Sequence, residues 1–104
     1  MTSTETISFN IIAAVGTARS NYVLAIDAAS EGKFDEAAQM IQEGNEAYEE
    51  GHQVHAQLLT KFAQGANTNV DLLLAHAEDQ MSSAEAFGIL AERFVTLYKK
   101  IYSK

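Results

Sequence analysis

The sequence has no cysteine and no proline, and it carries seven basic residues against fourteen acidic ones. Without cysteine the chain has neither a disulfide nor a thiol nucleophile, which fits a reducing compartment. Without proline no residue breaks the backbone of a long helix from within. The net charge of −7 argues against nucleic acid as a partner, because binding to phosphate backbones needs a basic surface.

Long apolar runs are also missing. No segment approaches the roughly 20 apolar residues that a membrane helix needs. The first residues, MTSTETISF, lack the basic start and apolar run of a secretion signal. We therefore expect a cytoplasmic protein without direct membrane insertion. The length of 104 residues predicts a single domain, residues 1–104, built around one core.

Three segments have apolar residues at the spacing of an α-helix. The first is predicted to begin near Thr2, where Glu5 completes a T-x-x-E capping box. It is predicted to end at SEGK, residues 30–33, with Gly32 as a left-handed cap. The apolar stripe of this helix comprises Ile7, Ile11, Val15, Ala18, Tyr22 and Ile26.

The second and third segments follow after short breaks. The second is predicted to begin at Phe34 and stop at QGANTN, residues 64–69, and the third to start at Thr68 or Asn69 with Asp71 in its first turn. The predicted inward stripe of the second comprises Phe34, Ala38, Ile41, Asn45, Tyr48, His52, His55, Leu59 and Phe62. That of the third comprises Leu73, Ala77, Met81, Ala84, Gly88, Ala91, Val95 and Tyr98.

Connections this short predict antiparallel neighbours, and hence an all-α, up-down-up three-helix bundle. Because the helices are long, the bundle should be a rod with a large surface. Some glycines inside the helices are expected to mark a close approach of two backbones. These interior glycines are Gly16, Gly44, Gly51 and Gly88.

The third helix has a second apolar stripe beside its first one. This second stripe comprises Leu72, Phe87, Leu90, Phe94, Leu97 and Ile101. A three-helix bundle needs only one face of this helix for its own core. We therefore expect the second stripe to mediate self-association.

His76, Asp79 and Gln80 lie on the second stripe, because residues three and four apart share one face of a helix. Three interpretations of His76 stay open: a hydrogen-bonded buried histidine, a metal ligand together with Asp79, and a nucleophile that accepts a phosphoryl group. Two ligands from one helix make a weak metal site by themselves. An imidazole is partly neutral near pH 7, as a phosphoryl acceptor requires. Conventional hydrolase and kinase motifs are missing.

The other two histidines, His52 and His55, fall on the predicted inward stripe of the second helix. Glu49-x-x-His52 copies half of the Glu-x-x-His pattern of di-iron bundles, but those bundles need a second such motif and more glutamates on four helices. His52 is therefore interpreted as a core or subunit-contact histidine that can hydrogen-bond the site around His76.

Four segments resemble one known family, the enzyme IIA components of the lactose/cellobiose (chitobiose) class of the phosphoenolpyruvate-dependent sugar phosphotransferase system (PTS). GTARS at 16–20 is similar to that family's G-[DN]-A-R-S, and residues 25–48 are similar to its A-x-x-A-x-x-G-[DN]-[FY]-x-x-A. GHQVHAQLL at 51–59 is similar to A-H-x-x-Q-T-x-L. LLLAHAEDQM at 72–81 is similar to L-L-x-V-H-A-Q-D-H-L-M, the most specific of the four.

The resemblance implies a phosphotransferase component. In it, His76 would take a phosphoryl group from the histidine-phosphocarrier protein and pass it to a cysteine of enzyme IIB, which serves the membrane enzyme IIC. The implied cargo is a lactose/cellobiose-type disaccharide. The resemblance further implies a homotrimer, a nine-helix bundle, in which Asp79 from each subunit surrounds one Mg²⁺ on the threefold axis. Three carboxylates at a dry interface would repel one another unless a cation held them.

The chain departs from the family pattern near His76. Glu78 replaces a glutamine and adds a charge, Gln80 replaces a histidine, and on the second helix His55 replaces a glutamine. The residues predicted to neighbour the phosphoryl group are Gln80, Ser82, Ser83 and His52. Such neighbours would act by positioning and by stabilising charge.

Two alternatives belong to other functional classes. One is a non-catalytic helical adapter, in which His76 and Asp79 only pack or hold a structural ion. The other is the histidine-phosphotransfer domain of two-component signalling, which is disfavoured because Ala-Glu-Asp follows His76 where that family has a lysine-glycine pair. The phosphoryl donor separates them: the histidine-phosphocarrier protein for the PTS component, a response regulator for the signalling domain, and none for the adapter.

Overall fold

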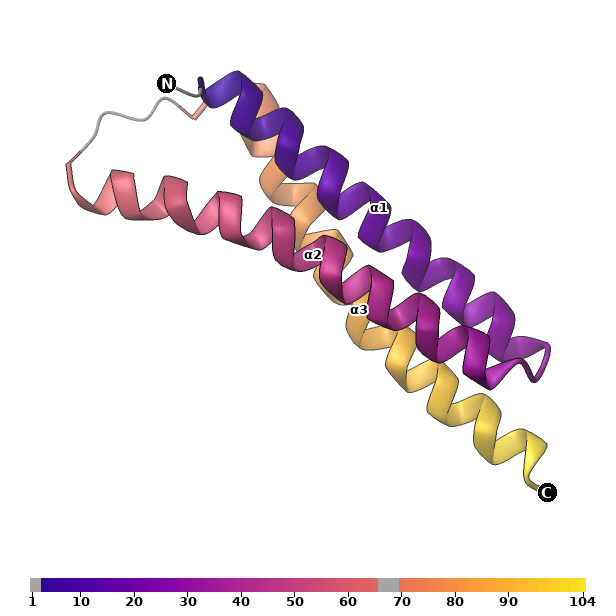
Figure 1. Ribbon diagram of the computed structural model, residues 1–104. Helices are drawn as coiled ribbons and strands as arrows, with labels where there is room; N and C mark the ends of the chain where they lie inside the picture. Colours follow the sequence, from indigo (N-terminus) through magenta and orange to yellow (C-terminus); the bar gives the residue numbers. More distant parts are fainter. Residues whose placement is uncertain (1–2, 66–69) are drawn as a thin grey trace.

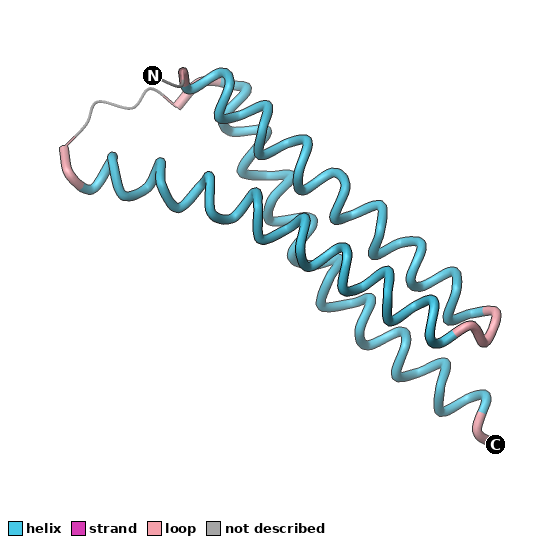
Figure 2. The backbone as a smooth tube through the Cα atoms, viewed as in Figure 1, coloured by secondary structure: helices cyan, strands magenta, loops and turns pink. Residues whose placement is uncertain are grey.

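The computed structural model describes residues 3–65 and 70–104, and these fold into three α-helices. They are α1 (Thr4–Ser30), α2 (Phe34–Ala63) and α3 (Leu72–Tyr102). α2 runs antiparallel to α1, and α3 returns parallel to α1 (Figure 1). The described residues form helices joined by short loops, with no strand among them (Figure 2). The prediction of an all-α, three-helix subunit is therefore confirmed.

The three-helix bundle is a rod that measures 57 × 19 × 18 Å. Its radius of gyration is 16.2 Å, whereas a compact domain of this size has about 13 Å. α1 packs along both other helices, but the second half of α2 diverges from α1 and α3 (Figures 1 and 2). In the described ranges, no helix is long and apolar enough to cross a membrane.

α1 begins one residue after Ser3, which is its N-cap. The Ser3 hydroxyl accepts a hydrogen bond from the backbone N–H of Thr6 at 3.1 Å, and this satisfies one of the free N–H groups of the first turn. The predicted capping box starts at Thr2, which lies outside the described residues.

α3 begins at Leu72, directly after the N-cap Asp71. The Asp71 carboxylate accepts from the backbone N–H of Leu74 at 2.9 Å. The start predicted at Thr68 or Asn69 lies outside the described residues, and Val70 and Asp71 precede the helix. Asp71 was predicted to lie in the first turn, whereas it is the N-cap residue of α3.

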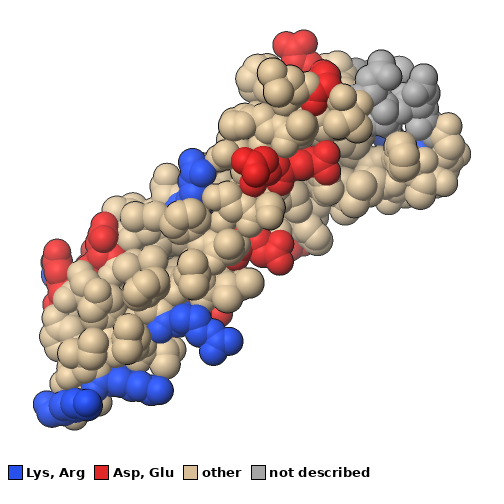
Figure 3. Space-filling view, turned by 180° about the vertical axis from the view of Figure 1, so that it is seen from behind, with Lys and Arg blue, Asp and Glu red and all other residues tan. Residues whose placement is uncertain are grey.

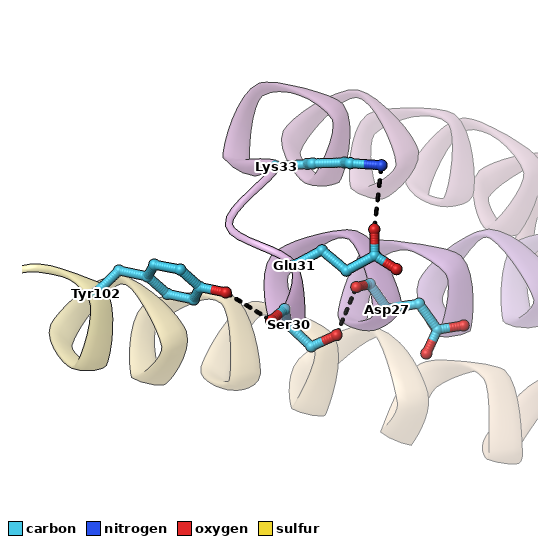
Figure 4. Close-up of polar contacts among 5 residues, drawn as sticks. All are labelled: Asp27, Ser30, Glu31, Lys33 and Tyr102. Carbon is cyan, nitrogen blue, oxygen red and sulfur yellow. Dashed lines mark hydrogen bonds and ion pairs between the residues drawn. The ribbon is translucent and has the colours of Figure 1, made fainter.

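The turn between α1 and α2 depends on Gly32, which has φ 79°. Its N–H donates to the Ala29 carbonyl at 3.0 Å, and the N–H of Lys33 donates to the Ala28 carbonyl at 2.9 Å. A residue with a Cβ rarely adopts this left-handed conformation. The predicted glycine cap is confirmed. Lys33 also reaches Glu31 across the turn at 3.0 Å, and this exposed ion pair raises the pKa of Lys33 (Figure 4).

Tyr102 fastens the end of α3 to this turn (Figure 4). Its hydroxyl donates to the Ser30 carbonyl at 2.8 Å, and its ring meets the Phe34 ring edge-on at 5.6 Å. A Cβ added at Gly32 would lie 3.0 Å from the Tyr102 ring. The three helices are thus joined at one end by a tyrosine that is half exposed.

The core lies along α1, as its apolar stripe predicted. Ile11, Val15, Ala18 and Tyr22 are buried, and the two ends of the stripe are half-buried. The predicted stripe of α3 is also confirmed. Its buried members are Ala77, Met81, Ala84, Ala91 and Val95.

The predicted inward stripe of α2 is wrong for five of its nine members, which are exposed. These are Ala38, Asn45, His52, Leu59 and Phe62. The residues buried instead are Ala37, Gly44, Gly51 and Leu58. These recur every seven residues, the spacing of a shallow helix crossing, and three of them are too small to stand out as apolar in the sequence.

Gly44 and Gly88 make room for the ring of Tyr22. A Cβ at Gly44 would lie 2.6 Å from a Tyr22 ring atom, and one at Gly88 would lie 2.9 Å from another. Gly51 has the same role against Val15 at 2.9 Å. These three glycines thus mark close packing, but their nearest neighbours are side chains and not the backbone of a second helix. A Cβ at Gly16 would meet nothing within 4 Å, so the expectation does not hold there.

Candidate functional site

His76 lies on the outward side of α3. Leu74, Ala77 and Met81 are buried against the other helices, and this fixes the rotation of α3 about its axis. His76 and Asp79 consequently face away from the bundle, and both are exposed. The interpretation of His76 as a buried core histidine of this bundle is therefore wrong. The hydrogen bonds and ion pairs found over residues 3–65 and 70–104 involve neither side chain.

Gln80 lies one turn after His76 on the same side of α3 and contacts α1. Its Oε1 accepts a hydrogen bond from Nη1 of Arg19 at 2.8 Å. Both residues are half-buried. Arg19 belongs to the GTARS segment of α1, and its position in the sequence does not predict a contact with Gln80.

Glu78 points to the other side of α3 from His76, because two residues along a helix turn the direction by about 200°. Its Oε2 lies 3.1 Å from Nε2 of His55 on α2. Glu78 and His55, which both depart from the family pattern, therefore contact each other. The charge expected beside His76 is directed towards α2.

The remaining predicted phosphate neighbours are not gathered together. Ser83 is half-buried on the His76 side of α3, whereas the exposed Ser82 lies on a different side. His52 stacks on the Tyr48 ring with the centroids 6.0 Å apart, and its Nδ1 lies 3.8 Å from Glu49. His52 is exposed, so the core alternative predicted for it is wrong, and the subunit-contact alternative stays a prediction. The phosphate-binding roles of these residues stay predictions.

An apolar surface continues from the site along α3. Most of the second stripe is exposed: Leu72 is 87% exposed, and the values for Phe94, Leu97, Leu90 and Ile101 run from 39% to 54%. On the α1 side this surface borders an open groove of about 490 Å³. The groove is lined by Arg19, Ser20, Val23, Leu24 and Phe87. No deep cavity that could enclose a sugar occurs among the described residues.

Charge is distributed unevenly on the face of the rod where α3 lies in front (Figure 3). Most Lys and Arg lie towards the end of the rod that holds the C-terminus, whereas Asp and Glu are spread along its whole length. Uncharged side chains occupy most of the surface between them. Lys99 and Lys100 stand in the last turn of α3, where they complement the negative end of the helix dipole.

One subunit by itself has no metal-binding cluster in its described ranges, since no three of its His, Asp and Glu side chains come together. Asp79 offers a single exposed carboxylate. An oxygen ligand of this kind suits Mg²⁺. A site of three such carboxylates would need three copies of the chain.

Comparison with known proteins identifies the chain. Residues 6–99 match the family described as "PTS system, Lactose/Cellobiose specific IIA subunit". The oligo-beta-mannoside-specific EIIA component of Bacillus subtilis is 36% identical over 95 residues, which covers 91% of this chain and 86% of that protein. The lactose-specific EIIA component of Staphylococcus epidermidis is 30% identical over 96 residues and 92% of each chain.

A solved structure agrees with these relatives. The crystal structure of the PTS cellobiose-specific enzyme IIA from Bacillus anthracis superimposes with a TM-score of 0.94 at 35% identity, over 100% of this chain and 96% of that one. The all-helical fold is thus that of a sugar phosphotransferase system component. The chain belongs to the lactose/cellobiose-specific IIA family.

Proposed function

We propose that this protein is a cytoplasmic phosphocarrier that accepts a phosphoryl group on His76. The donor would be the histidine-phosphocarrier protein, and the acceptor a cysteine of enzyme IIB that serves enzyme IIC during uptake of a lactose/cellobiose-type disaccharide. The observation that carries this proposal is the exposure of His76 on an open, largely apolar face. A partner protein can contact a ring on an open face. A small-molecule substrate would need an enclosed pocket around the ring.

In the proposed reaction, one ring nitrogen of His76 attacks the phosphorus of the donor's phosphohistidine. The new N–P bond forms as the donor's N–P bond breaks, and the donor ring takes up a proton as it leaves. In the second transfer a thiolate sulfur of enzyme IIB attacks the phosphorus. The S–P bond forms as the N–P bond to His76 breaks, and the His76 ring takes up a proton as it leaves. Little covalent chemistry is left for the protein, so catalysis rests on positioning and on charge stabilisation.

The intact mass of the protein after incubation with phosphoenolpyruvate, enzyme I and the histidine-phosphocarrier protein tests this proposal. We expect each chain to gain one phosphoryl group that is lost in acid, as phosphohistidine is. An unchanged mass with a donor that phosphorylates another IIA component would contradict the proposal and favour the helical adapter.

We further propose that three copies assemble into a nine-helix homotrimer through the second stripe of α3. The exposed stripe supports this, since apolar surface of this extent on a small rod favours association. His76 and Asp79 lie at one end of the same stripe. The phosphoryl site would therefore border a cleft between subunits that shields it from water.

Placing a charge on the stripe should break the trimer. We expect Leu90→Glu, at a site 50% exposed within the subunit, to shift the mass in light scattering from three chains to one, because the interface cannot solvate a carboxylate. Ile89→Glu is the matched control: it adds the same charge at a site 55% exposed on another side of α3 and should leave the trimer intact. A trimeric Leu90→Glu variant would contradict this interface.

We also propose that Asp79 carboxylates from three subunits hold one Mg²⁺ on the threefold axis. Such an ion would neutralise carboxylates that otherwise repel one another. Asp79 supplies the oxygen ligand that the ion prefers, and it stands on the stripe assigned to the interface.

Removal of the metal should therefore weaken the assembly. We expect EDTA to lower the melting temperature of the native protein by several degrees and added Mg²⁺ to restore it, by the linkage between binding and stability. Asp79→Asn should abolish this response because the amides carry no charge for the ion to neutralise. An equal response to EDTA in native protein and variant would refute the site.

A further inference from the structure

The contact between Arg19 and Gln80 brings a cation close to His76. Arg19 Nη1 donates to Gln80 Oε1 at 2.8 Å. Gln80 lies four residues after His76, which is about 6 Å along the helix axis and on the same side of α3. The guanidinium of Arg19 is therefore held about one helical turn from the residue that the proposed function makes the phosphoryl acceptor.

Both side chains keep hydrogen-bond donors for an anion. A guanidinium has five N–H donors and no acceptor, so the Gln80 carbonyl must face it and the Gln80 NH₂ group must point elsewhere. Gln80 accepts one hydrogen bond from Arg19, so the remaining N–H groups of the guanidinium can donate to an anion. Over residues 3–65 and 70–104, no carboxylate forms an ion pair with Arg19. Its positive charge is consequently not neutralised within the chain.

The charge of the whole molecule makes this cation important. The chain has a net charge of −7, and a phosphoryl group on His76 would add up to about two more negative charges. Of the other basic residues, Lys99 and Lys100 lie in the last turn of α3, Lys61 lies in the last turn of α2, and Lys33 pairs with Glu31 at the turn between α1 and α2. Arg19 is the basic residue bonded to the His76 side of α3.

We propose that Arg19 is a catalytic residue that donates hydrogen bonds to the phosphoryl oxygens during transfer to and from His76, and that Gln80 positions its guanidinium. This inference rests on the proposed function. Arg19 makes and breaks no covalent bond and keeps its proton: it binds the three oxygens while one N–P bond forms and the other breaks. A planar fork of donors suits a phosphoryl group.

The test compares Arg19→Gln with Arg93→Gln in single-turnover transfer from the phosphorylated histidine-phosphocarrier protein. The control removes the same charge from an exposed arginine at a distant site on α3. We expect Arg19→Gln to lower the maximal rate about 100-fold, the usual effect of losing one transition-state donor, with the half-saturating donor concentration unchanged. Arg93→Gln should transfer at the native rate, and Arg19→Lys should recover part of the loss.

The outcomes separate this inference from the proposed function. A native protein that gains no phosphoryl group overturns both. A native protein that is phosphorylated while folded Arg19→Gln reaches the native maximal rate overturns the role of Arg19 alone. If Arg19→Gln does not fold, ¹⁵N spectra of the native protein decide. The Arg19 side-chain N–H signals should shift on phosphorylation while those of Arg93 stay unchanged, and unchanged Arg19 signals would overturn the proposal.

Discussion

His76→Ala should abolish phosphoryl acceptance while leaving the bundle folded. The ring is exposed, and no described residue bonds to it, so its removal leaves no cavity and no unpaired buried group. We expect the melting temperature of the variant to stay within a few degrees of the native value. Transfer from the histidine-phosphocarrier protein should fall below detection, at least about a thousandfold, because no other nitrogen occupies the place of the ring.

The control for this variant is His55→Gln. His55 is one of three histidines in the chain, and its Nε2 contacts Glu78 on the side of α3 away from His76. The variant should accept a phosphoryl group as the native protein does. Retained labelling in His76→Ala, or loss of labelling in a folded His55→Gln, would place the acceptor elsewhere.

Tyr22→Ala should cause the largest loss of stability of any single change considered. Tyr22 is 3% exposed, and its ring fills the space that Gly44 and Gly88 leave open. Truncating a buried aromatic ring typically costs about 3–5 kcal/mol, a large part of the roughly 5–15 kcal/mol that holds a small domain folded. Urea unfolding at a fixed protein concentration measures this difference, since oligomers unfold in a concentration-dependent way.

Tyr22→Phe separates the ring from its hydroxyl. The hydroxyl donates to Oδ1 of Asn45 at 2.7 Å. Burial, with smaller effects of Glu92 and Tyr48, raises the pKa of Tyr22, so it stays a protonated donor throughout the neutral range. Asn45 is exposed and can turn to water, so we expect a loss of only about 0.5–1 kcal/mol. A cost for Tyr22→Ala no larger than that for Tyr22→Phe would contradict the packing role of the ring.

The sequence predicted α1 and α3 well because large aliphatic residues mark their inward faces. Ile11, Val15 and Met81 are buried where the helical period placed them. In α2 the face towards the bundle consists mainly of Gly44, Gly51 and Ala37, which have little or no apolar side chain. The apolar periodicity of α2 therefore points to the larger residues next to these small ones, and it predicts an inward position for His52, which follows Gly51.

The site was predictable only as far as it lies on one helix. His76, Asp79 and Gln80 share a face of α3 by their spacing alone, and the structure keeps them on that face. The Arg19–Gln80 contact joins residues 61 positions apart. Predicting this contact would need the register of α1 against α3, which depends on long-range contacts such as the packing of Gly88 on Tyr22 and the hydrogen bond from Tyr102 to Ser30. The same holds for the pairing of His55 with Glu78.

Peptide mapping of the phosphorylated native protein tests the central claim most directly. Trypsin cleaves after Lys33, Lys61 and Arg93, so His52 and His55 fall in peptide 34–61 and His76 is the only histidine of peptide 62–93. Mass spectrometry under alkaline conditions, which preserve phosphohistidine, should find the phosphoryl group on peptide 62–93 alone. A phosphoryl group on peptide 34–61 would contradict the assignment of His76 as the carrier.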